Sequence, residues 1–158
     1  MKKLPNLLTR PLGSQDFYPV FSSYPAVKKL DYRRYLVEVG TGIDLHGEDA
    51  TKAAQRAVKD AISHSSMIGL SQLFKIKSFS DIEEALMVDV TVAAPDPEKV
   101  DGEVVLATLP EGKRRINIVK GGLKFPADST KDDAKTHPIL MINAVIVVLI
   151  DVDKVPRK

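Results

Sequence analysis

A short polar segment of the chain carries the residue types that could do chemistry. Asp44, His46 and Glu48 alternate along it, and alternating residues of an extended segment point the same way. Two carboxylates and one imidazole would then lie together. Because histidine titrates near neutral pH, and a neighbouring carboxylate can fix its tautomer and raise its basicity, Asp44 and His46 are the candidate acid–base pair.

The same three residues have two other interpretations. Imidazole and carboxylate groups are ligands for divalent metals, although this alternating spacing is the signature of no particular metal site. In the structural interpretation, His46 bonds to a neighbouring acid and only holds the loop. The sequence leaves all three interpretations open, predicts no resident cofactor and leaves enzymatic activity undecided.

The start of a helix pattern follows the polar segment directly. The first N–H groups of a helix are unpaired and its N-terminus is positive, which favours an anion there. Asp49 or Thr51 can cap this helix, which is the structural interpretation of those two residues. Lys52 lies in the first turn and could reach a bound anion, and Arg56 shares its helix face. A solvated basic face is the alternative, and the favoured, interpretation of the two cations.

Glycines and isolated polar residues complete the candidate set. Gly40 and Gly42 are not a dinucleotide fingerprint, because Leu45 stands where the third glycine belongs. A glycine pair after Lys120 permits close backbone approach to a ligand or a tight turn, and Asn143 inside an apolar run is a hydrogen-bonding node or a site residue. The candidate ligand-binding residues are Gly40, Gly42, Gly47, Asp49, Thr51, Lys52, Arg56, Lys120, Gly121, Gly122 and Asn143.

These residues lie where a strand pattern gives way to a helix pattern. Residues 33–43, RRYLVEVGTGI, alternate in polarity and predict a first strand that Gly40 and Gly42 end. From about Ala50 to Ser65, alanines and branched residues recur at three- and four-residue spacing. This spacing predicts an amphipathic helix with a small-residue face that can lie close to a sheet.

Three later stretches predict further strands. They are LMVDVTV at 86–92, RRINIVK at 114–120 and ILMINAVIVVLI at 139–150. Residues 68–76 fit a short helix or a loop, and the crossover before Gly112 fits one helical turn or an extended piece. The sequence therefore predicts an α+β fold in β-α-β-β-β order, with one four-stranded mixed sheet and one main helix, about 50–65, packed on it.

The apolar character of the strands predicts self-association. The first and last strands carry apolar residues on both sides, so both faces of the sheet should be covered. One long helix and one short helix cannot cover both faces. A second copy of the chain is the simplest cover, which predicts a homo-oligomer, a trimer or larger. The leading hypothesis for function is a binding site or active site for a small anionic molecule at the strand–helix junction, residues 40–56. The alternative is a non-catalytic structural or regulatory homo-oligomer in which these residues only cap and brace the turn.

Composition excludes several classes of protein. The chain has 158 residues, 44% of them hydrophobic and 28% charged, with a net charge of +2, no cysteine and no tryptophan. These values predict one soluble domain, residues 31–158, with no disulfide, and they argue against nucleic-acid binding. The longest apolar run, at 139–150, is shorter than the roughly 20 residues of a membrane-spanning helix.

Residues 1–30 differ from the rest of the chain. They are basic, contain a single acid, Asp16, and are interrupted by four prolines. This composition predicts a flexible or surface-wrapping extension or an organelle transit peptide, and it lacks the apolar core of a secretory signal. The expected location is the cytoplasm, or an organelle if the extension is a transit peptide.

The segment from Gly40 to Ile62, GTGIDLHGEDATKAAQRAVKDAI, resembles the signature of the lin-type family of conserved hypothetical proteins. Pro110, Gly112, the Gly121–Gly122 pair and Asn143–Ala144 also fit that family's pattern. The resemblance runs from Tyr35 to about Asp151 and implies no assigned activity. The element order is also similar, more distantly, to the trimeric fold of chorismate mutase and the small imine deaminases, which implies a site between subunits without transferring catalytic residues.

Overall fold

The chain folds as an α+β protein in the computed structural model, which describes residues 32–45, 49–110, 112–126 and 138–155. The predicted extension, residues 1–30, and most of the polar loop before the last strand lie outside these ranges. In chain order the elements are β1 (Tyr32–Asp44), α1 (Ala50–Ile62), α2 (Ile68–Leu73), α3 (Phe79–Ala85), β2 (Leu86–Ala94), the short 3-10 helix η2 (Pro97–Lys99), α4 (Gly102–Leu106), β3 (Lys113–Lys120), β4 (Leu123–Phe125) and β5 (Ile139–Asp151).

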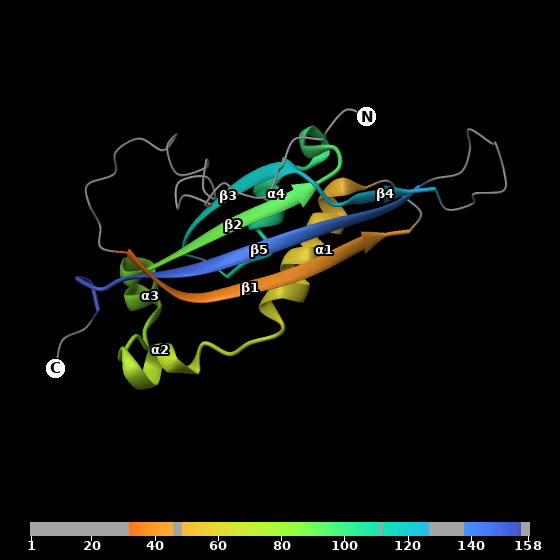
Figure 1. Cartoon of the computed structure of the whole chain (residues 1–158). Coiled ribbons are helices and arrows are strands. Elements are labelled where there is room, and N and C mark those ends of the chain that lie inside the picture. The colour runs from red at the N-terminus through yellow and green to blue at the C-terminus, as the bar shows by residue number, and fades with distance from the viewer. Residues whose placement is uncertain (1–31, 46–48, 111, 127–137, 156–158) are drawn as a thin grey trace, which may run out of the picture. The chain divides into compact units, whose positions relative to one another are not determined.

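The sheet is mixed, as predicted, but it has five strands where the sequence predicts four. The order is β1-β5-β2-β3, with β5 antiparallel to β1 and β2, and with β2 parallel to β3 (Figure 1). The additional strand, β4, pairs with β5 beyond the end of β2, where Leu123 lies opposite Met141. Three residues are too short for an alternating pattern to predict, so β4 is invisible in the sequence.

The longest apolar run forms the central strand. β5 lies between β1 and β2, and its even-numbered residues, from Leu140 to Ile150, are buried on one face of the sheet. Its odd-numbered residues from Ile139 to Leu149, on the other face, are only half-buried. The strand has neighbours on both of its edges, but the helices cover only one face of the sheet. The apolar side chains on the other face of β5 therefore have no helix against them within the described residues.

Helix α1 lies directly against β1, and two glycines make this possible. A Cβ on Gly42 would lie 1.9 Å from the Ala53 carbonyl oxygen, and a Cβ on Gly40 would lie 2.3 Å from the Ala57 carbonyl oxygen. Neither glycine ends the strand, which was the prediction, because β1 continues to Asp44. Their role in the fold is to remove side chains where the helix backbone crosses the strand.

The middle of the chain contains more helix than the sequence predicts. Residues 81–85 do not lead into the strand as an extended segment, because Ser78 and Asp81 form a reciprocal capping box that starts α3. The stretch 68–76, left open between helix and loop, contains α2. Helix α1 ends at Ile62, three residues before the predicted end, with Ser63 as its C-cap.

Two buried clusters hold the elements together. The larger lies between the sheet and the helices α1 and α4, and its centre includes Val58, Val90 and Ile142. The smaller joins α2 and α3 to the end of the sheet, where the rings of Tyr35 and Phe74 meet edge to face at 5.8 Å. In Figure 1, α1 and α4 lie behind the sheet, while α2 and α3 lie near one end of it.

The opposite face of the sheet carries no helix in the part of the chain that the structure describes. Odd-numbered residues from Val37 to Ile43 and along β5 point to it, because they alternate with the residues that face α1. Leu123 and Phe125 share this face, since they lie opposite odd-numbered residues of β5. We call this surface the open face; its apolar residues include Val37, Val39, Ile43, Leu123, Phe125, Met141, Val145 and Val147.

Candidate functional site

Asp44, the predicted catalytic carboxylate, is buried at the end of β1 and is fully engaged by its neighbours. One oxygen, Oδ2, accepts the Asp49 backbone N–H at 3.0 Å. The other, Oδ1, lies 3.2 Å from Nη1 of Arg56, which also donates to the Ile43 carbonyl. These bonds tie the strand end to the N-cap and the second turn of α1, as the structural interpretation of this segment requires.

Asp49 and Thr51 anchor the beginning of α1. Asp49 is the N-cap, and its Oδ1 accepts the backbone N–H of Lys52 at 2.9 Å. The hydroxyl of Thr51 accepts the Asp101 backbone N–H at 2.9 Å and donates to the Lys99 carbonyl at 3.3 Å. Thr51 therefore joins α1 to the segment that leads into α4, and both residues have a place in the fold without a ligand.

The contacts of Asp44 belong to a longer row of polar bonds between α1 and β1. Farther along, Asp60 Oδ2 accepts the Thr41 backbone N–H at 2.8 Å. Beyond the end of the helix, the Ser65 hydroxyl donates to the carboxylate of Glu38. We call this row of bonds, from Asp44 to Glu38 on the strand and from Asp49 to Ser65 on the helical side, the α1–β1 seam.

The acid–base and metal interpretations depend on residues outside the described ranges. His46, Gly47 and Glu48 all lie there, so the predicted trio with Asp44 stays a prediction. Among the described residues, no group of three or more histidine, cysteine, aspartate or glutamate side chains is placed to hold a metal ion.

The remaining predicted ligand-binding residues do not converge on one point. Gly121 donates its N–H to the Ala94 carbonyl at 2.9 Å, and Gly122 has φ +70°. The pair therefore forms the turn that carries the chain from β3, where Lys120 is exposed, to β4 beside β5. Asn143 lies on the open face, where its Oδ1 accepts from the Thr41 hydroxyl at 3.0 Å. The junction residues Asp44 and Arg56 lie on the other side of the sheet.

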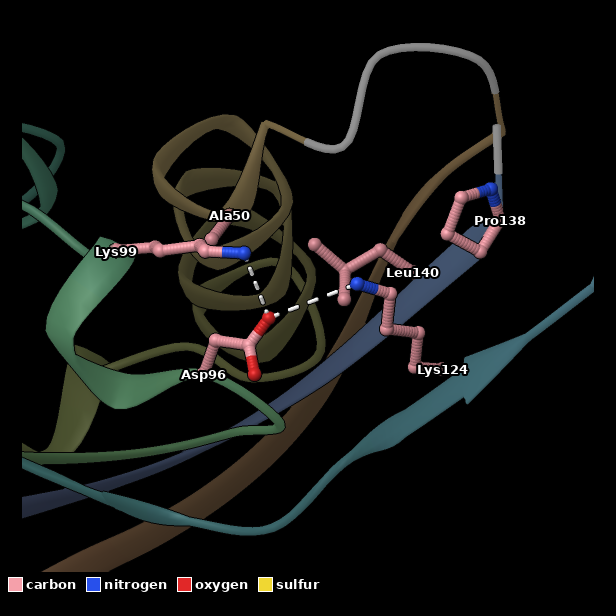
Figure 2. Close-up of a pocket in the computed structure, with 6 residues that line it drawn as sticks. All are labelled: Ala50, Asp96, Lys99, Lys124, Pro138 and Leu140. Carbon is pink, nitrogen blue, oxygen red and sulfur yellow. Dashed lines mark hydrogen bonds and ion pairs between the residues drawn. The ribbon is translucent and has the colours of Figure 1, made fainter. Parts of the chain in front are cut away.

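A shallow pocket beside the start of α1 contains residues that the sequence reasoning missed. Asp96, Lys99 and Lys124 line it with Ala50, Pro138 and Leu140, and it has room for little more than one water-sized group. Figure 2 shows both ammonium groups directed at the same oxygen of Asp96, with Lys99 at 2.9 Å and Lys124 at 3.7 Å. The only sequence signal was the three-residue spacing of Asp96 and Lys99.

One carboxylate offsets part of the positive charge around this pocket. The hydrogen bond from Lys99, together with the attraction of both ammonium groups, lowers the pKa of Asp96 below its ordinary value, against a smaller opposing effect of burial. An ionised Asp96 therefore lies between the two lysines, in a pocket that Ala50, the first residue of α1, also lines. An anion bound at this point would have to compete with that carboxylate.

Comparison with known proteins places the chain among its relatives. A family model described as a conserved hypothetical protein, Lin0512, matches residues 34–148. The chain belongs to the Lin0512 family. This confirms the resemblance indicated by the segment from Gly40 to Ile62, whereas the more distant likeness to chorismate mutase and the imine deaminases is not confirmed.

A solved structure is also similar to this Lin0512 protein. It is the crystal structure of an FtsZ-like protein of unknown function from Nostoc punctiforme, with 34% identity and a TM-score of 0.62 over 76% of this chain and 97% of that one. A search of curated proteins gave no match. Within the described residues, no helix is long and apolar enough to cross a membrane.

Proposed function

We propose that this Lin0512 protein is a non-catalytic structural or regulatory homo-oligomer whose copies meet through the open face. One observation carries the proposal: large apolar side chains remain exposed on that face while α1 and α4 cover the other. Val37 is 55% exposed, Val39 58%, Leu123 50% and Phe125 52%. Contiguous apolar surface of this kind commonly marks a protein–protein interface.

The charges on the open face favour a second copy over a charged partner. Asp89 and Arg115 lie opposite each other on β2 and β3 and form an ion pair at 2.7 Å, which leaves no net charge between them. The nearby Thr41 and Asn143 side chains bond to each other. Arg34 and Lys113 lie on this face only at one end, in the row of Leu149 and Met87, so the remainder is apolar and locally neutral. Such a surface is complementary to another copy of itself, as a two-fold interface requires.

The α1–β1 seam supports the non-catalytic part of the proposal. The Asp44 carboxylate, the Arg56 guanidinium and the Asp49 cap hold the strand–helix junction by bonds to one another. A catalytic carboxylate must reach a substrate proton, whereas Asp44 is buried and accepts hydrogen bonds from its own chain. In this proposal the junction residues cap and brace the turn. We expect the protein to act in the cytoplasm, or in an organelle if residues 1–30 direct it there.

The Val39→Lys variant tests the interface. Placing an unpaired ammonium group in an apolar interface costs about 3–5 kcal/mol, which would weaken association by two orders of magnitude or more. Val104→Lys is the matched control, because Val104 is also an exposed valine, at 42%, but lies on α4. We expect sedimentation velocity to show a smaller species for Val39→Lys and the wild-type species for Val104→Lys. Equal masses for all three proteins would refute the interface.

A second candidate function is binding of a small anion, as the residue types of segment 40–56 predict. The observation that favours it is the position of Lys99 and Lys124 beside Ala50, the first residue of α1 (Figure 2). The helix N-terminus and the two ammonium groups would attract a phosphate or carboxylate group if it displaced Asp96. This candidate includes a role for Lys52, in the first turn.

Inorganic phosphate is the simplest probe of that site. We expect millimolar phosphate to raise the melting temperature of Asp96→Asn more than that of the wild-type protein, because the variant removes the competing carboxylate. Sodium chloride at equal ionic strength is the control for general screening. Lys124→Ala removes one of the two ammonium groups. If phosphate raised the melting temperatures of Asp96→Asn and Lys124→Ala equally, an anion site at this pocket would be excluded.

A further inference from the structure

The outer edge of β1 is open to a neighbouring strand along part of its length. β1 pairs with β5 on one side and is the terminal strand of the sheet that the described residues form. The Thr41 N–H donates to Asp60 of α1 and so points away from β5. Backbone groups of every second residue in a strand point to the same edge, so those of Val37, Val39 and Ile43 also point outward. An exposed edge of this kind is a template for the same strand of a second copy.

Helix α1 closes the edge at two adjacent outward positions. Asp60 accepts the Thr41 N–H at 2.8 Å, and Arg56 donates to the Ile43 carbonyl. Four residues of helix advance about 6 Å and two residues of strand about 6.7 Å, so the two spacings match. Since Gly40 and Gly42 bring the helix onto the strand, side chains as short as aspartate reach the edge.

Asp60 is also held by its own helix. Its second oxygen lies 3.4 Å from Nε2 of His64, one turn later. This contact and the Thr41 bond use different carboxylate oxygens, so they can be separated by substitution. Next to Thr41, the outward backbone groups of Val39 have no hydrogen-bond partner within the described residues.

We propose that Asp60, with Arg56, blocks antiparallel pairing of β1 with β1 of a second copy, and so confines self-association to the open face. The block of the β1 edge stands on its own, whereas the confinement of self-association to the open face rests on the proposed function. Without the Asp60 carboxylate, the Thr41 N–H is released beside Val39, and a continuous stretch of edge becomes available. The occupant of that edge would be β1 of another copy, related by a two-fold axis.

Asp60→Ala tests the proposal, and two control variants isolate the edge bond. Asp60→Asn keeps a carbonyl oxygen that can accept the Thr41 N–H but loses the charge, and His64→Ala removes the contact of His64 alone. All three are made in a Leu123→Lys background, in which the open face is disrupted. We expect Asp60→Ala to associate at least tenfold more tightly than the background in sedimentation velocity, and Asp60→Asn and His64→Ala to match it.

Hydrogen exchange gives a second readout, and its comparison of two amides in the wild-type protein does not depend on a variant folding. The Thr41 amide should exchange about tenfold to a hundredfold more slowly than the Val39 amide, and Asp60→Ala should remove that difference while Asp60→Asn keeps it. Equal exchange at the two amides, or unchanged association of Asp60→Ala, would overturn the edge proposal. If the wild-type protein were monomeric and the Asp60→Ala variant associated, the open-face interface would be refuted and the edge block supported.

Discussion

Substitution of Gly42 by alanine is the sharpest perturbation of the contact between α1 and β1. The added Cβ would lie 1.9 Å from the Ala53 carbonyl oxygen and 2.4 Å from the Ala57 backbone nitrogen. Both atoms belong to the helix backbone, so no side-chain rotation relieves the clash. To restore ordinary contact, α1 must move away from the sheet by about 1.5 Å.

The magnitude follows from two opposing effects. Overpacking of a closely packed core costs about 1–3 kcal/mol or more, whereas alanine gains about 0.4–1 kcal/mol over glycine by restricting the unfolded chain. We expect the free energy of unfolding to fall by about 2 kcal/mol. For a chain of this size the melting temperature would fall by about 4–8 °C.

Urea denaturation and thermal unfolding followed by circular dichroism measure this change. Gly102→Ala is the control, because its Cβ would meet only the methyl ends of Ile116 at 3.1 Å and Ile118 at 3.4 Å. We expect Gly102→Ala to stay within about 1 kcal/mol of the wild-type protein. If Gly42→Ala were as stable as Gly102→Ala, the close approach of α1 to β1 would be wrong.

Two further predictions concern single carboxylates. Asp44→Asn should lower the free energy of unfolding by about 2–3 kcal/mol in urea titrations, because it removes the charge that Arg56 meets. It should leave the response to phosphate unchanged. Normal stability of Asp44→Asn would contradict the bracing role. Backbone hydrogen bonds from Ser78 and Lys77 lower the pKa of Asp81, so its ionised form stabilises the fold above the ordinary pKa of 3.8, and this contribution is lost as the pH falls through the lower folded value. Unfolding measured between pH 7 and pH 3 should therefore show a smaller acid-dependent loss for Asp81→Asn than for the wild-type protein, and parallel curves would exclude the capping role.

The parts of the fold that follow a simple repeat were predictable from the sequence. The alanines of α1 repeat with helical spacing, and the apolar runs of β2, β3 and β5 are long enough to identify strands. The three-residue strand β4 and the seven-residue helix α3 are too short to give such a repeat. Sheet order depends on contacts between distant residues, such as Gly42 opposite Ile142, that local patterns do not contain.

The candidate site was predictable only as a location. The sequence indicated that residues 40–56 form a strand–helix junction with polar groups, and the structure has that junction. It did not indicate that Arg56 meets Asp44 twelve residues earlier, because that contact depends on where α1 crosses β1. It also gave no sign that Gly40 and Gly42 lie under the helix backbone, which is a property of the packed pair rather than of either segment.

The molar mass of the full-length protein in solution tests the central claim most directly. Sedimentation equilibrium over a concentration series from 1 to 100 μM, with Val39→Lys measured beside the wild-type protein, would determine it. The open-face interface predicts a wild-type mass of two or more chains and a shift toward one chain for Val39→Lys. A wild-type mass of one chain at every concentration would contradict the claim.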